Sequence, residues 1–195
     1  MSLSFLDKED FSFAGHRLVR FFLSAHKELV TLLLSEIEAV SSEFTYSHKI
    51  NGRWENAYLP IEKVPSVRKV VHFSRNVAIE KFGTSLLATY DKQKGVRSMP
   101  FWFNIAKPGE STGVHDHSSQ ARVSGVFYLK TSENSGNIFF RVPDHPDFEL
   151  ECSEGSVILF PSCLSHGVQV NRSQKDRISL AFNLLKFPLH VDYNL

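Results

Sequence analysis

The stretch Val114-His115-Asp116-His117 places two histidines two residues apart, and a third histidine, His166, follows much later in the chain. On an extended segment the side chains at i and i+2 project to the same side, whereas the residue between them points away. His115 and His117 can therefore converge on one ion, with Asp116 turned elsewhere. Neutral imidazole is a good ligand for iron, zinc, copper and nickel. The pair, joined by His166, indicates a divalent metal site.

The composition is that of a folded protein with no nucleic-acid or membrane signature. The chain has 195 residues, 42% of them apolar and 22% charged, so we expect a single domain with a substantial core. A net charge of +1 provides no basic footprint for nucleic acid or an anionic membrane. No apolar run is long enough to span a membrane, and Met1–Asp7 lacks the order of a signal peptide. The two cysteines form no Cys-x-x-Cys motif, so we expect a cytoplasmic protein without disulfides.

The N-terminal part of the sequence reads as helical. From Asp10 to about Phe44, apolar residues recur at three- and four-residue steps, which predicts one helix or two helices broken near Ala25. Thr45–Lys63 shows no sustained period and contains the turn signal Asn51-Gly52. A second helical pattern covers Ser66–Phe82, with Pro65 before it and Gly83 after it.

After Gly83 the period changes to that of short strands separated by turn residues. Eight strands are predicted: Leu86–Tyr90, Met99–Ala106, Ala121–Lys130, Asn137–Val142, Phe148–Cys152, Ser156–Phe160, Gly167–Val170 and Arg177–Leu185. That number and spacing indicate a sandwich or barrel. We therefore expect an α+β fold in one domain, residues 1–195, with a mostly helical part, 1–83, packed on a β core formed by 84–195.

Motifs spread over the C-terminal half resemble one known family. They are Phe101-Trp102-Phe103-Asn104, His115-Asp116-His117, Ser124–Leu129, Gly155–Pro161, His166-Gly167-Val168 and Arg177–Asn183. In this order they are similar to those of the iron(II)- and 2-oxoglutarate-dependent oxygenases, especially a group of small members from bacteria and phages. The resemblance implies a double-stranded β-helix, the jelly-roll shared with cupins, with a metal at one open end.

The resemblance also implies the metal ligands. His115 matches the first ligand and His166 the distal one, whereas the superfamily usually has a carboxylate at the position of His117. We expect a three-histidine site, as in the small group. Asp116 is the alternative ligand, but it would need a bulge to face the ion. Its carboxylate could instead accept a hydrogen bond from the N–H of a metal-bound imidazole.

Four further residues are candidates for binding 2-oxoglutarate. Arg177 resembles the family's anchor for the far carboxylate, which its planar guanidinium can bind through two hydrogen bonds. Alternation along the last strand places Ser179 on the same face, where a serine in relatives binds the same carboxylate. Tyr128 and Asn104 are candidates for the same pocket.

The function implied by the resemblance is an iron(II)- and 2-oxoglutarate-dependent dioxygenase. Such an enzyme consumes dioxygen, releases succinate and CO2, and usually hydroxylates its substrate. Two alternatives stay open: a cupin-like three-histidine dioxygenase that does not use 2-oxoglutarate, and a non-catalytic metal-binding jelly-roll module. The expected partners are dioxygen and a small molecule that the sequence does not identify, without nucleic acid or membrane. A homodimer through the N-terminal helices is a further expectation.

Overall fold

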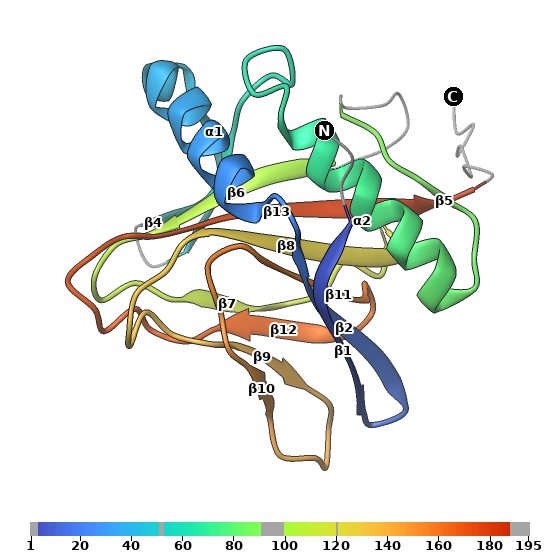
Figure 1. Cartoon of the computed structure of the whole chain (residues 1–195). Helices are drawn as coiled ribbons and strands as arrows, with labels where there is room; N and C mark the ends of the chain where they lie inside the picture. The colour runs from blue at the N-terminus through green and yellow to red at the C-terminus, as the bar shows by residue number, and fades with distance from the viewer. Residues whose placement is uncertain (1–3, 51–52, 91–99, 120, 188–195) are drawn as a thin grey trace, which may run out of the picture.

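The computed structural model describes residues 4–50, 53–90, 100–119 and 121–187, which form two antiparallel sheets and two α-helices (Figure 1). In this part of the chain the larger sheet has nine strands in the order β1-β2-β11-β8-β13-β6-β4-β3, with β5 paired to β13. These strands are β1 (Phe5–Phe13), β2 (His16–Leu23), β3 (Thr45–Ile50), β4 (Arg53–Tyr58), β5 (Leu86–Leu87), β6 (Phe101–Ala106), β8 (Val123–Lys130), β11 (Ser156–Pro161) and β13 (Arg177–Lys186).

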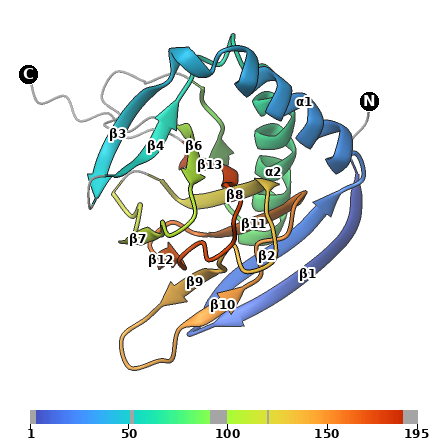
Figure 2. The same cartoon turned by 90° about the vertical axis from the view of Figure 1, so that its left-hand side faces the viewer.

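The smaller sheet has the order β10-β9-β12-β7. Its strands are β7 (Thr112–His115), β9 (Ile138–Arg141), β10 (Phe148–Leu150) and β12 (Ser165–Val168). In both views it lies across from the larger sheet, on the side opposite the helices (Figures 1 and 2). Apolar side chains from the two facing sheets, among them Val126, Ile138, Phe140 and Phe160, fill the space between them.

The helices α1 (His26–Ala39) and α2 (Val67–Phe82) cover the outer face of the larger sheet. Their buried residues, such as Leu33 and Val70, join Phe127 and Leu180 of the sheet in the larger apolar core. The expectation that helices cover a β core is confirmed. The end of α2 at Phe82 agrees with the prediction from the sequence, because Gly83 adopts the left-handed conformation (φ 61°) that ends a helix.

The helix predicted from Asp10 is wrong over its first half. β1 and β2 form a hairpin there, and the α-helix α1 begins only after Ala25, where a break was expected, with a short 3-10 helix, η1 (Ser41–Glu43), after it. The turn is Ala14-Gly15, in which both residues have positive φ (47° and 80°), as a two-residue type I′ hairpin requires. β2 then pairs with β11, so these residues extend the sheet instead of packing on it.

The segment Thr45–Lys63 also contributes strands. β3 and β4 pair with each other, and β4 joins β6 through Ala57 and Phe103. The predicted turn Asn51-Gly52 lies outside the described residues. β7 was not predicted from the sequence. The other C-terminal strands lie within a few residues of their predicted bounds, although Met99, the predicted start of β6, is outside the described residues.

Candidate metal centre

The three predicted histidines meet at one end of the space between the sheets. His115 is the last residue of β7, and His166 lies directly opposite it on β12. His117 follows two residues beyond the end of β7, where its backbone N–H donates to Ser162 O over 2.8 Å. The candidate ligand atoms of the three imidazoles all lie within 4.8 Å of one another. Antiparallel pairing of β7 with β12 therefore assembles the cluster from distant parts of the sequence.

Main-chain carbonyls orient two of the three rings. The Nδ1 atom of His115 lies 2.8 Å from Gly113 O, and that of His166 lies 3.0 Å from Leu164 O. A carbonyl oxygen only accepts, so both Nδ1 atoms carry the hydrogen, which leaves the Nε2 lone pairs for a ligand. Burial, and then the neighbouring His115, lower the pKa of His166 to about 3. His166 is therefore a neutral, metal-competent imidazole at physiological pH.

His117 and Asp116 point to different environments. The ring of His117 lies against Trp102, with 5.3 Å between the ring centroids, and faces the other two imidazoles. The carboxylate of Asp116 is exposed and accepts hydrogen bonds from Ser118 N and Oγ, at 2.9 and 2.6 Å, which lower its pKa. Among the described residues, the cluster of potential metal ligands includes His117 and not Asp116.

A cavity lies between the sheets next to the three histidines. Its walls include Trp102, Asn104, Val126, Tyr128, Phe160, Ser179, Ala181 and Asn183. No described residue that lines it is an acid, a lysine or an arginine.

The sheet register sorts these walls into rows. Ser179 on β13 lies between Asn104 on β6 and Tyr128 on β8. One row further along β13, Ala181 lies between Trp102 and Val126. The three predicted co-substrate residues next to Arg177 thus form one polar row.

Arg177 is buried at the start of β13, two residues before Ser179, and only 2% of its surface is exposed. Its Nη1 donates to Ser135 O and, over 3.2 Å, to Gln169 O. Gly136 makes room for this group, because a Cβ at that position would meet Arg177 Nη1 at 2.9 Å. Burial lowers the pKa of Arg177. Its Nη2 atom has no hydrogen-bond partner in the described part of the chain.

Tyr128 is the second buried group that lacks a partner at this end. Its hydroxyl makes no hydrogen bond of regular geometry with the described residues, and its polar neighbour is the thiol of Cys152, a weak acceptor. Burial raises the pKa of Tyr128 well above its ordinary value, with a smaller contribution from Cys152, whereas the charge of Arg177 opposes the rise. A buried donor left unpaired is costly unless a ligand satisfies it. An unpaired guanidinium nitrogen and an unpaired hydroxyl close to each other fit a carboxylate.

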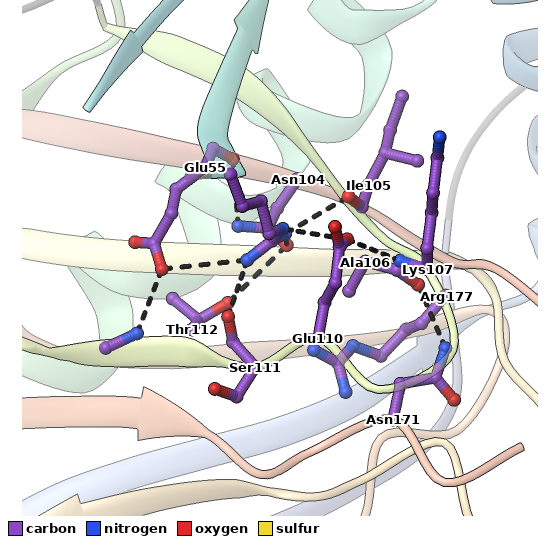
Figure 3. Close-up of polar contacts among 12 residues, drawn as sticks. Glu55, Asn104, Ile105, Ala106, Lys107, Glu110, Ser111, Thr112, Asn171 and Arg177 are labelled. Atoms are coloured by element: carbon purple, nitrogen blue, oxygen red, sulfur yellow. Dashed lines mark hydrogen bonds and ion pairs between the residues drawn. The ribbon is translucent and has the colours of Figure 1, made fainter. Parts of the chain in front are cut away.

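Asn104 lines the cavity, but its amide is already engaged by the N-terminal strands. Its Nδ2 donates to Glu55 O over 3.0 Å, and its Oδ1 accepts from Arg53 Nη2 over 2.9 Å. Figure 3 shows this group of polar contacts between β4, β6 and β7. Neither Arg53 nor Glu55 was singled out from the sequence, which carries no motif around them.

Asn183 was also missed as a site residue, although it shares the alternating face of Arg177 and Ser179. It lines the cavity and is 1% exposed. Ser124 Oγ donates to its Oδ1 over 2.8 Å, whereas its Nδ2 has no partner among the described residues. Asn183 is therefore an open donor in the wall of the cavity.

Comparison with protein families gives one match. A family model described as "Putative 2OG-Fe(II) oxygenase" matches residues 141–183, the segment that contains His166 and Arg177. The resemblance is to the 2OG-Fe(II) oxygenases. The resemblance inferred from the sequence is thus confirmed over this segment, and the three-histidine cluster fits the predicted His-x-His…His motif. No curated protein matches the chain in sequence.

Solved structures similar to this fold include several 2OG-Fe(II) oxygenases. A prolyl-4-hydroxylase from Pseudomonas putida is 17% identical with a TM-score of 0.63, over 89% of this chain and 94% of that one. The carbocyclase SnoK from nogalamycin biosynthesis is 15% identical with a TM-score of 0.67, over 87% and 79%. The epimerase SnoN, in complex with Fe3+, alpha ketoglutarate and nogalamycin RO, is 12% identical with a TM-score of 0.65, over 87% and 78%. These likenesses confirm the double-stranded β-helix fold.

The residues present fit the two groups that the family name implies. Three imidazoles form a donor set that suits Fe(II). The partnerless Arg177 Nη2 and Tyr128 hydroxyl suit a carboxylate of 2-oxoglutarate. No helix in the described part of the chain is long and apolar enough to cross a membrane.

Proposed function

We propose that the protein is an iron(II)- and 2-oxoglutarate-dependent dioxygenase that hydroxylates a small molecule and releases succinate and CO2. The observation that carries the proposal is that the two facing sheets each contribute a group with nitrogen atoms left for a ligand. The histidine cluster offers imidazole nitrogens to a metal, and Arg177 offers a buried, partnerless N–H to an anion.

In this proposal His115, His117 and His166 hold Fe(II). Arg177 binds the far carboxylate of 2-oxoglutarate, and the row of Tyr128, Ser179 and Asn104 borders it. Bound Fe(II) would supply the activation of dioxygen, and 2-oxoglutarate would supply two of the electrons that reduce dioxygen as it is oxidised to succinate and CO2. Asp116 does not ligate the metal and only stabilises the turn after β7 through Ser118.

The chain's own contribution is orientation and exclusion of water. The carbonyls of Gly113 and Leu164 fix two imidazoles so that the same nitrogens always face inward. Buried Arg177 presents a charge that water does not screen, so an entering carboxylate gains a strong hydrogen bond.

The cavity wall suggests what kind of substrate group reaches the metal. Without an acidic, lysine or arginine side chain among its described lining residues, it suits an uncharged group. Asn183 Nδ2 is the donor available to an oxygen of that group. The substrate is thus proposed to present a carbonyl or hydroxyl oxygen near the carbon that is oxidised.

The test is an anaerobic titration of the purified protein with Fe(II) and then 2-oxoglutarate, followed in the visible spectrum. A charge-transfer band, and succinate formed once oxygen is admitted, are expected. Metal binding without the band would favour the three-histidine dioxygenase that does not use 2-oxoglutarate. Absence of metal binding would refute the metal centre, and metal binding without either the band or succinate would leave the non-catalytic metal-binding module as a further alternative.

A cytoplasmic location, a single domain and a homodimer remain predictions from the sequence. Size-exclusion chromatography with light scattering tests the homodimer directly, since a monomer mass of 22.2 kDa would contradict it.

A further inference from the structure

Glu55, on β4 of the β3–β4 hairpin, is a buried carboxylate far in sequence from the histidines. It is 6% exposed. Its Oε1 accepts the backbone N–H of Gly113 over 3.1 Å and lies 3.6 Å from Arg53 Nη1. Buried carboxylates need such partners, because desolvation of the charge is costly.

Gly113 connects Glu55 to the metal centre. It lies on β7, which is an edge strand whose pairing with β12 is irregular between His166 and Val168. The carbonyl oxygen of the same Gly113 accepts the Nδ1–H of His115 over 2.8 Å. A glycine has no side chain to hold it, so its orientation depends on what its backbone groups contact. The carboxylate holds the N–H on one side of the Gly113 Cα, and the imidazole is held by the carbonyl on the other.

Arg53 contacts both Glu55 and the connection between β6 and β7. Its Nη1 donates to Ser111 O over 2.5 Å, and its Nε lies 3.0 Å from Glu110 Oε2. Glu110 is therefore a second carboxylate partner of Arg53. Its Oε2 accepts from Lys107 N over 2.7 Å and has no contact with Gly113 among the interactions of the described residues. This makes Glu110 a matched comparison for Glu55.

We propose that Glu55 is a positioning residue for the metal centre, which sets the direction of the His115 imidazole through the hydrogen bond to Gly113 N–H. The β3–β4 hairpin then supports the metal centre, although it supplies no ligand. This inference rests on the proposed function, because it requires that His115 binds a metal.

The experiment measures Co(II) binding by calorimetry and by the visible absorption of the bound ion, in the full-length protein and four variants. Glu55→Ala removes both the hydrogen bond and the charge. Glu55→Gln keeps an acceptor oxygen at the same reach without the charge, whereas Glu55→Asp keeps the charge on a shorter side chain. Glu110→Ala removes the other carboxylate of Arg53.

Positioning through Gly113 predicts that Glu55→Ala and Glu55→Asp lower Co(II) affinity about tenfold and alter the absorption band, as loss of support behind a ligand does. Glu55→Gln should keep the wild-type absorption band and a Co(II) affinity within about threefold of the wild-type value. Glu110→Ala should leave both the band and the affinity unchanged. Wild-type affinity in Glu55→Asp, or equal losses in Glu55→Gln and Glu110→Ala, would overturn the inference. If Glu55→Ala does not fold, the Gln and Asp variants decide alone.

The outcome separates this inference from the proposed function. A wild-type protein that binds no Co(II) or Fe(II) would refute the metal centre itself. A wild type that binds, with Glu55 variants that bind equally well and give the same spectrum, would refute only the role of Glu55.

Discussion

The histidine end of the site, formed by His115, His117 and His166, and its arginine end, formed by Arg177 with Tyr128, follow the same rule but differ in their exposure to water. At both ends a main-chain carbonyl engages one nitrogen of a side chain and leaves another for a ligand, as Gly113 O does for His115 and Gln169 O for Arg177. His115 and His117 are only partly buried, whereas Arg177 is almost completely enclosed. The metal end can therefore be solvated before a ligand binds, and the arginine end cannot.

This difference has an energetic consequence. An imidazole is neutral, so leaving its Nε2 unpaired costs little more than a lost hydrogen bond. A buried guanidinium is charged, so leaving it without an anion costs more, and the cost is recovered when a carboxylate arrives. The arginine end should therefore contribute most of the affinity for the co-substrate, and the histidine end all of the affinity for the metal.

The largest effect is expected at the histidine end, from two neighbouring substitutions. His117→Ala should lower Fe(II) affinity more than about 100-fold, beyond the range for residues that merely support a ligand. Asp116→Ala should change it by less than about threefold, because that carboxylate contacts Ser118 instead. Anaerobic Fe(II) titration measures both. A larger loss in Asp116→Ala would mean that the carboxylate is the true ligand.

The next largest effect is expected at the arginine end. Arg177→Leu should weaken 2-oxoglutarate binding about 100-fold, since removing one partner of a buried charge pair costs roughly 2–5 kcal/mol. Fe(II) affinity should stay unchanged, which would establish that the two ends act independently. The measurement is a 2-oxoglutarate titration of the Fe(II) protein. Arg141→Leu, which removes an exposed ion pair with Asp147, is the matched control and should bind normally.

A smaller effect is expected for Tyr128→Phe. Its hydroxyl has no partner among the described residues, so its removal should not lower the thermal midpoint of the ligand-free protein. It should weaken 2-oxoglutarate binding by about three- to tenfold, the value of one hydrogen bond. A drop in stability with unchanged affinity would show instead that the hydroxyl serves the fold.

The exclusion of water from the arginine end can be measured without a substitution. Burial raises the pKa of Cys152, beside Tyr128 and Arg177, to about 11, so its thiol stays protonated at pH 8. Iodoacetamide should therefore label exposed Cys163 and spare Cys152 until the protein is unfolded. Mass spectrometry of the two peptides gives the ratio. Comparable labelling of both cysteines would mean that water reaches the arginine end.

The features predicted correctly from the sequence are those that depend on a simple period of two residues along a strand. The alternation from Arg177 to Asn183 predicted a strand with one polar face, and the register of β13 bears this out. His-x-His predicted side chains that converge, which they do, although His117 lies beyond the end of β7. These inferences needed only neighbouring residues.

The rest depends on contacts that the sequence does not reveal. Leu18, Phe21 and Phe22 are spaced as on a helix, but they lie on a strand, and Phe21 and Phe22 pair with β11, whose sequence lies far away. The type I′ turn at Ala14-Gly15 lacks the usual asparagine or aspartate, so it gave no strong signal. Glu55 was missed for the same reason, because its partner is a backbone N–H and carries no side-chain signature.

Trp102 gives the centre an optical signal of its own. The chain has two tryptophans, of which Trp102 is 7% exposed and lies beside the ring of His117, whereas Trp54 is 47% exposed on the hairpin. A transition-metal ion held by His117 would lie within quenching distance of the buried indole. Its blue-shifted emission should therefore fall as the centre fills, while the red-shifted emission of Trp54 provides an internal reference. Metal occupancy could then be followed in the unmodified protein by fluorescence alone.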